Sequence, residues 1–117
     1  MPALLLSAPA AAAFAGPGWF GGIVDAAQSD TPGAELIAAL DCGSMPGHAL
    51  AALRRGLPVI RYDGPAFDAI TSIARKHDAC VLKERPVTLD LGTVDAPIDA
   101  DLDLLAKKCG DWLTAKA

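Results

Sequence analysis

Short continuous runs of apolar residues recur along the chain, and each is followed by turn-forming Gly, Pro, Ser or Asp. Runs of this kind are typical of strands that are buried on both faces, as in parallel sheets. The pattern therefore predicts strands at residues 3–7, 35–42, 57–62 and 79–83. Residues 87–91 are a candidate fifth strand at the edge of the sheet.

Between these runs the apolar residues recur at spacings of three and four, which is the period of an amphipathic helix. The spacing predicts a helix over residues 19–28 and a second that ends at Arg55, with Ser44 as its N-cap and Gly56 just after its last turn. A third is expected after Asp63-Gly64-Pro65, with Asp63 as its cap.

The clearest helical period lies near the end of the chain, over residues 98–116. Its acidic residues fall in the first turns and its lysines lie later, which complements the helix dipole. The apolar positions that carry the period are Ile98, Leu102, Leu105, Cys109, Trp112 and Leu113.

Strands that alternate with helices indicate an α/β fold with right-handed crossovers and a mainly parallel sheet. We expect one domain over residues 1–117: a small three-layer α/β/α domain with a sheet of four or five strands, flavodoxin-like or Rossmann-like in its layers. A half-barrel-like arrangement is the alternative. A complete eight-stranded barrel typically needs about 250 residues.

The composition is apolar for so small a chain. Hydrophobic residues make up 52%, many of them Ala, and the net charge is −4. No Lys or Arg precedes Arg54, so no basic stripe is available for nucleic acid, and we expect no nucleic-acid partner. The apolar surplus favours a homo-oligomer, most simply a two-fold dimer, in which Trp19 and Trp112 are candidate contacts.

Three cysteines with no C-x-x-C spacing indicate reduced thiols in a cytoplasmic protein. With only two histidines, scattered along the chain, no metal site is expected. The apolar N-terminal stretch has no Lys or Arg and so differs from a secretory signal. No apolar run reaches the roughly 20 residues that a membrane-spanning helix needs, so no membrane partner is expected either.

Polar and small residues stand at or just after the end of each predicted strand, and in a parallel sheet these positions meet at one edge, where ligands of α/β proteins bind. The candidate ligand-binding residues are Ser7, Asp41, Ser44, Asp63 and Lys83, with Arg85 as a further source of positive charge. Such residues are also what turns and helix caps require. The candidate partner is a small anionic ligand, and we expect this edge, not the opposite one, to carry it and the main pocket.

Residues 16–21 match the pattern G-x-G-x-x-G, but the segment does not follow its strand directly, and its Pro and aromatic residues would crowd a pyrophosphate. The favoured role is a flexible Gly-rich entry to the first helix, with Trp19 as a packing or interface residue, and no cofactor is expected.

Cys42 and His48, with Asp41 to orient the imidazole, form a weak candidate catalytic set, because a thiol near a helix start is activated. This hypothesis predicts that Cys42 reacts with thiol reagents before Cys80, which lies in an apolar strand. Two functions therefore stay open: a non-catalytic, self-associating binding module, and a small enzyme that uses the same edge.

Overall fold

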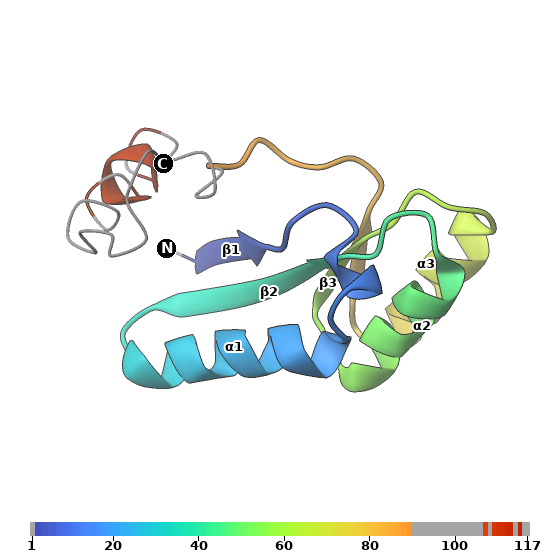
Figure 1. Cartoon of the computed structure of the whole chain (residues 1–117), viewed down its shortest axis with the longest axis horizontal. Coiled ribbons are helices and arrows are strands. Elements are labelled where there is room, and N and C mark those ends of the chain that lie inside the picture. Colours follow the sequence, from blue (N-terminus) through green and yellow to red (C-terminus); the bar gives the residue numbers. More distant parts are fainter. Residues whose placement is uncertain (1, 90–106, 108, 114, 116–117) are drawn as a thin grey trace. The chain divides into compact units, whose positions relative to one another are not determined.

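The computed structural model describes residues 2–89, 107, 109–113 and 115 (Figure 1). The chain divides into two compact units, Met1–Arg85 and Pro86–Ala117. The first unit contains β1 (Pro2–Leu6), the short 3-10 helix η1 (Ala11–Ala13), α1 (Pro17–Asp30), β2 (Glu35–Asp41), α2 (Pro46–Arg55), β3 (Val59–Arg61), α3 (Phe67–Lys76) and β4 (Cys80–Leu82).

The four strands form one sheet in the order β1-β2-β3-β4, and every neighbouring pair is parallel. The predicted α/β class with a parallel sheet is confirmed. A doubly wound three-layer sheet reverses its strand order at a switch point. The sequential order found here is instead that of the half-barrel-like alternative.

The helices of this unit share one side of the sheet. Right-handed crossovers in a sheet of sequential order place successive helices on the same face, and α1 contacts α2 as α2 contacts α3. A single buried cluster joins all three helices to alternate strand residues. Its members include Val24, Leu40, Ala49, Leu53, Ile60, Ile70 and Ala74.

The predicted helix ends are partly confirmed. Gly56 adopts a left-handed conformation (φ 90°) at the end of α2, as a glycine at that position should. The predicted caps are wrong: Met45 is the N-cap of α2 in place of Ser44, and Ala66 is that of α3 in place of Asp63. Neither cap makes a side-chain hydrogen bond to its helix.

Gly64 fixes how the loop after β3 packs. A Cβ atom at this position would lie 2.2 Å from the Ser44 carbonyl oxygen and 2.7 Å from the Tyr62 hydroxyl oxygen. Only a residue without a side chain allows the β3–α3 loop to approach the β2–α2 loop this closely. The two loops therefore form one packed surface at the carboxyl ends of the strands.

Two predictions concern the second unit. Residues 87–89 are not in a strand, and the rest of the candidate fifth strand lies outside the described residues. Residues 107, 109–113 and 115 are helical, within the helix predicted over 98–116, whose first part is likewise outside the described residues. Among the described residues, no helix has both the length and the apolar character to cross a membrane.

Candidate functional site

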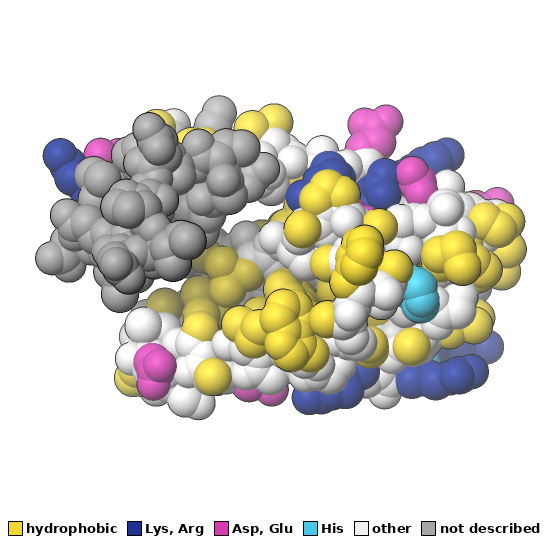
Figure 2. All heavy atoms as spheres, in the orientation of Figure 1, with side chains coloured by type: hydrophobic (Ala, Val, Ile, Leu, Met, Phe, Trp, Pro, Cys, Tyr) yellow, Lys and Arg dark blue, Asp and Glu magenta, His cyan; other side chains and the backbone are white. Residues whose placement is uncertain are grey.

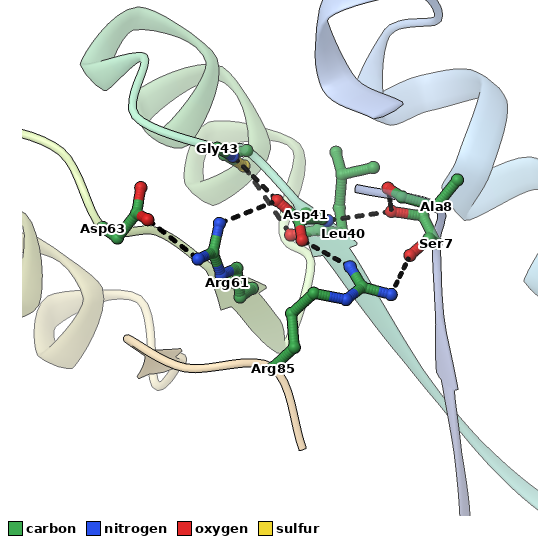
Figure 3. A network of polar contacts seen from close by, with 9 residues as sticks. Ser7, Ala8, Leu40, Asp41, Gly43, Arg61, Asp63 and Arg85 are labelled. Atoms are coloured by element: carbon green, nitrogen blue, oxygen red, sulfur yellow. Dashed lines mark hydrogen bonds and ion pairs between the residues drawn. The ribbon is translucent and has the colours of Figure 1, made fainter. Parts of the chain in front are cut away.

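Charged side chains from three elements converge where the strands end, as Figure 3 shows. Asp41 is the last residue of β2, Arg61 is the last residue of β3, and Arg85 follows β4. Asp41 and Arg61 are register partners in the parallel pair, so their side chains leave the same face of the sheet.

The Asp41 side chain is fully buried and is satisfied from several directions. Its carboxylate accepts hydrogen bonds from the Gly43 backbone N–H at 2.8 Å, from Arg85 Nη1 at 2.5 Å and from Arg61 Nη1 at 3.4 Å. Burial alone would raise the pKa of Asp41, but the backbone N–H groups of Gly43 and Ala10, the Arg85 bond and the Arg61 charge outweigh it, so the pKa is lowered. The group is therefore held as a carboxylate.

Ser7 and Asp63 extend this network on either side. The Ser7 hydroxyl accepts the Asp41 backbone N–H at 2.9 Å, and the Ser7 carbonyl oxygen accepts Arg85 Nη2 at 3.2 Å. Asp63, whose side chain is 41% exposed, accepts Arg61 Nη2 at 2.8 Å. Three of the five predicted ligand-binding residues, Ser7, Asp41 and Asp63, thus lie in one connected cluster.

Ser44 and Lys83 lie at the same edge but outside the hydrogen-bonded cluster described above. Ser44 is exposed, and its carbonyl oxygen packs against Gly64. The Lys83 ammonium lies 5.5 Å from the centre of the Phe67 ring, a cation–π arrangement. Phe67 in turn stacks on Tyr62 at 6.4 Å between ring centres. Lys83 is therefore held at the start of α3, where it adds a positive charge.

The Cys42–His48 geometry does not favour a nucleophile. Because successive strand residues point to opposite faces, Cys42 points away from Asp41 and lies in the helix-side core, 1% exposed. Its thiol donates weakly to the Leu40 carbonyl oxygen, and burial together with the Asp41 charge raises its pKa to about 12. Among the described residues, Nδ1 of half-buried His48 has no hydrogen-bond partner.

The predicted order of cysteine burial is wrong. Cys80 was expected to be buried, but it is exposed, whereas Cys42 is buried. The reason lies in the one-sided cover of the sheet: Val81 packs against the helix-side core, so its neighbour Cys80 points to the other face.

Residues 17–22 lie inside α1, so the expectation of a flexible entry before the helix is wrong, and Trp19 is 59% exposed. Gly18 and Gly21 lie inside α1, and Cβ atoms there would lie 3.7 Å from the guanidinium of Arg55 and 3.4 Å from a methyl of Leu57, respectively. Both distances are ordinary van der Waals separations, so Arg55 at the end of α2 and Leu57 after it lie beside this face of α1.

A hollow of about 140 Å³ lies beside this contact, lined by Gly21, Val24, Leu36, Arg55 and Leu57 among others. It is at the edge where β3 begins, away from the strand-end cluster. Sites for small organic molecules usually span about 300–1,000 Å³. The hollow is therefore too small to replace the strand-end cluster as the candidate site.

Arg61 is the member of the cluster that sequence reasoning missed. Arg61 lies in an apolar run and looks like an ordinary strand residue. However, a charged residue at the end of a buried strand needs a counter-ion, and Asp41 at the end of the neighbouring run can pair with it. That pairing was the available signal.

Within the described part of the chain, no group of three or more His, Cys, Asp or Glu residues is placed to hold a metal ion. Comparisons of the chain with protein-family models, with curated proteins and with solved structures find no match.

Proposed function

We propose that this chain is a non-catalytic, self-associating binding module that holds a small oxyanion, such as a phosphate or a carboxylate, where its strands end. The observation that carries the proposal is the convergence of two guanidinium groups, Arg61 and Arg85, on this edge. Each guanidinium has five N–H donors and uses two of them in the contacts described. Donors thus remain for the oxygens of a ligand.

The charge of the edge sets the class of ligand. Asp41 and Asp63 balance Arg61 and Arg85, and the Lys83 ammonium adds positive charge nearby. Helix α2 also begins here, and N–H groups at a helix start favour an anion. A small, singly or doubly charged anion suits this balance better than an extended polyanion does.

The absence of a catalytic role is supported by the state of the thiol. A nucleophilic cysteine has a lowered pKa and an accessible sulfur. Cys42 has neither, since it is buried and its pKa is raised to about 12. The three cysteines of the chain are all free, which fits the reducing cytoplasm in which we place the module.

Self-association is supported by large apolar side chains on the described surface. Figure 2 shows hydrophobic side chains gathered over α1 and the connection that leads into it. The exposed residues of this α1 patch are Phe14 (88% exposed), Trp19 (59%) and Ile23 (48%). Leu4 (40%) and Leu5 (37%) of β1 expose further apolar surface, away from α1 in the chain. Exposed apolar surface of this kind marks interaction sites in soluble proteins, so the described unit offers two candidate surfaces for self-association.

Calorimetric titration with inorganic phosphate tests the anion site. We expect saturable binding that Arg85→Gln weakens by about tenfold or more, because a charge-assisted hydrogen bond contributes about 1.5–3 kcal/mol. Lys83→Gln should weaken it less, since that ammonium also rests on Phe67. Arg75→Gln, which removes an exposed charge from the end of α3, is the matched control and should bind as the wild type does.

Equal phosphate affinity in Arg85→Gln and Arg75→Gln would contradict the assignment, as would the lack of any saturable heat in the wild type. Circular dichroism of each variant checks that the sheet and helices are retained.

A further inference from the structure

One face of the sheet is left open by the helices of its own unit. The helix-side cluster takes Leu40 from β2, Ile60 from β3 and the packed Val81 from β4, so their neighbours in sequence point to the other face. The register of β1 adds Leu4 and Leu6, which pair with Ile37 and Ala39. The open face is therefore largely apolar, with Leu4, Leu6, Ile37, Val59, Cys80 and Leu82 on it.

These side chains are incompletely covered. Leu4 is 40% exposed and Cys80 is exposed, while Leu6, Ile37, Val59 and Leu82 are half-buried. Apolar surface left in water costs about 25 cal/mol per Å² relative to its burial. A partner that covers this face would thus be strongly favoured.

The edges of the sheet also lack partners among the described strands. β1 and β4 each pair on one side only, and an edge strand presents unpaired N–H and C=O groups. Because all four strands are parallel, a two-fold axis along the strand direction brings β4 of one copy beside β1 of a second copy in the same parallel sense. Two sequential four-stranded sheets joined in this way have the strand number and order of an eight-stranded parallel barrel.

The charges at the seam are complementary. Exposed acids lie at the β1 side of the unit, with Asp30 at the end of α1 and Glu35 at the start of β2. Exposed bases lie at the other side, with Arg75 and Lys76 in the last turn of α3. Both groups are at the edge where strands begin, so joining β4 to a second β1 brings opposite charges toward each other.

We propose that a second copy of this chain covers the open face, so that two half-barrels close into one eight-stranded parallel barrel. This inference rests on the self-association proposed above, and it assigns the contact to the open face of the sheet instead of the α1 patch. The Asp41–Arg61–Arg85 clusters of both copies then surround one mouth at the carboxyl ends of the strands, which is where parallel barrels bind their ligands. Closure thus completes the proposed anion site from two chains.

Sedimentation velocity of the full chain with two matched variants tests this surface. Leu4→Lys places a charge on the open face, where closure would bury it, and should weaken the dimer by about tenfold or more. Ile23→Lys places the same charge on the α1 patch, at 48% exposure against 40% for Leu4, and should leave the dimer intact. Circular dichroism confirms that each variant is folded.

Labelling of Cys80 with a thiol reagent gives a second measurement, which needs no variant. In the closed dimer Cys80 faces the interior, so its labelling in the wild type should accelerate over the same dilution range in which the dimer dissociates. In Leu4→Lys it should be fast at every concentration.

A dimer that Ile23→Lys dissociates and Leu4→Lys does not would overturn the closed barrel while self-association stands. A wild-type monomer at every concentration would overturn both, whereas the phosphate titration judges the anion site separately. Labelling of Cys80 at a constant rate across the dissociation range would also overturn closure.

Discussion

Replacing Asp41 with Asn removes the charge on which the strand-end cluster is built while keeping the shape of the side chain. The carboxylate is fully buried and binds two guanidiniums, Arg85 at 2.5 Å and Arg61 at 3.4 Å. The amide oxygen of Asn can still accept the Gly43 N–H that the carboxylate accepts at 2.8 Å. The variant therefore tests the charge of Asp41 and not its hydrogen bond to Gly43.

The expected loss of unfolding free energy is about 2–3 kcal/mol at pH 7. Breaking a fully buried ion pair costs about 3–5 kcal/mol, and an exposed pair contributes about 0–1 kcal/mol. The cluster lies between these limits, since Asp41 is fully buried while the Arg61 and Arg85 side chains are 17% and 30% exposed.

The loss should also depend on pH, with a sign fixed by the lowered pKa of Asp41. A carboxyl whose pKa is lower in the folded than in the unfolded chain stabilises the fold above the unfolded value, about 3.9 for Asp. That stabilisation disappears as the pH falls through the folded-state pKa. The difference between wild type and Asp41→Asn should therefore shrink as the pH is lowered from 7 to about 2.

Urea unfolding followed by circular dichroism at several pH values measures both effects. Asp25→Asn is the matched control, because Asp25 is exposed on α1 and such surface changes usually stay within about 0.5 kcal/mol. An Asp41→Asn variant as stable as Asp25→Asn at pH 7 would refute the reasoning. So would a loss that keeps its full size at low pH.

Three further outcomes follow from the packing. In the dissociated Leu4→Lys chain, Cys80 should be alkylated before Cys42, because Cys80 is exposed and Cys42 is buried. Mass spectrometry measures this order, and the reverse order would contradict the fold. Gly64→Ala should clearly lower the urea concentration at the unfolding midpoint, since its Cβ would lie 2.2 Å from the Ser44 carbonyl oxygen. Gly22→Ala, which has open space around its Cβ, is the control and should be neutral or stabilising. Tyr62→Phe should cost about 0.5–1.5 kcal/mol in the same assay, because the hydroxyl donates to the Pro65 carbonyl oxygen at 2.5 Å; an unchanged midpoint would show that this bond contributes nothing.

The elements of the first unit could be predicted from the sequence because their signals are local. The apolar run before Cys42 reads as a buried strand without knowledge of its neighbours, and Gly56 marks the end of α2 by its conformation alone. Which strands pair is not a local property, so the chain pattern left the three-layer and half-barrel arrangements open. The sequential sheet order selects the second.

The candidate site was predictable to the extent that it consists of turn residues. Asp41 ends a strand, and Ser7 and Asp63 lie just after strands, so the parallel sheet brings all three to one edge. Arg61 was missed because its role depends on a register partner, Asp41, twenty positions earlier in the chain. Cys42 does not join this cluster, since a residue next to Asp41 on a strand points to the opposite face.

The central claim is that this chain works as a self-associating module, and the mass of the unmodified protein in solution tests it most directly. Sedimentation equilibrium over a hundredfold range of concentration, at neutral pH with reduced thiols, should give twice the chain mass of 12.0 kDa at the upper end and a fall toward 12.0 kDa on dilution. A mass of 12.0 kDa at every concentration would contradict the account.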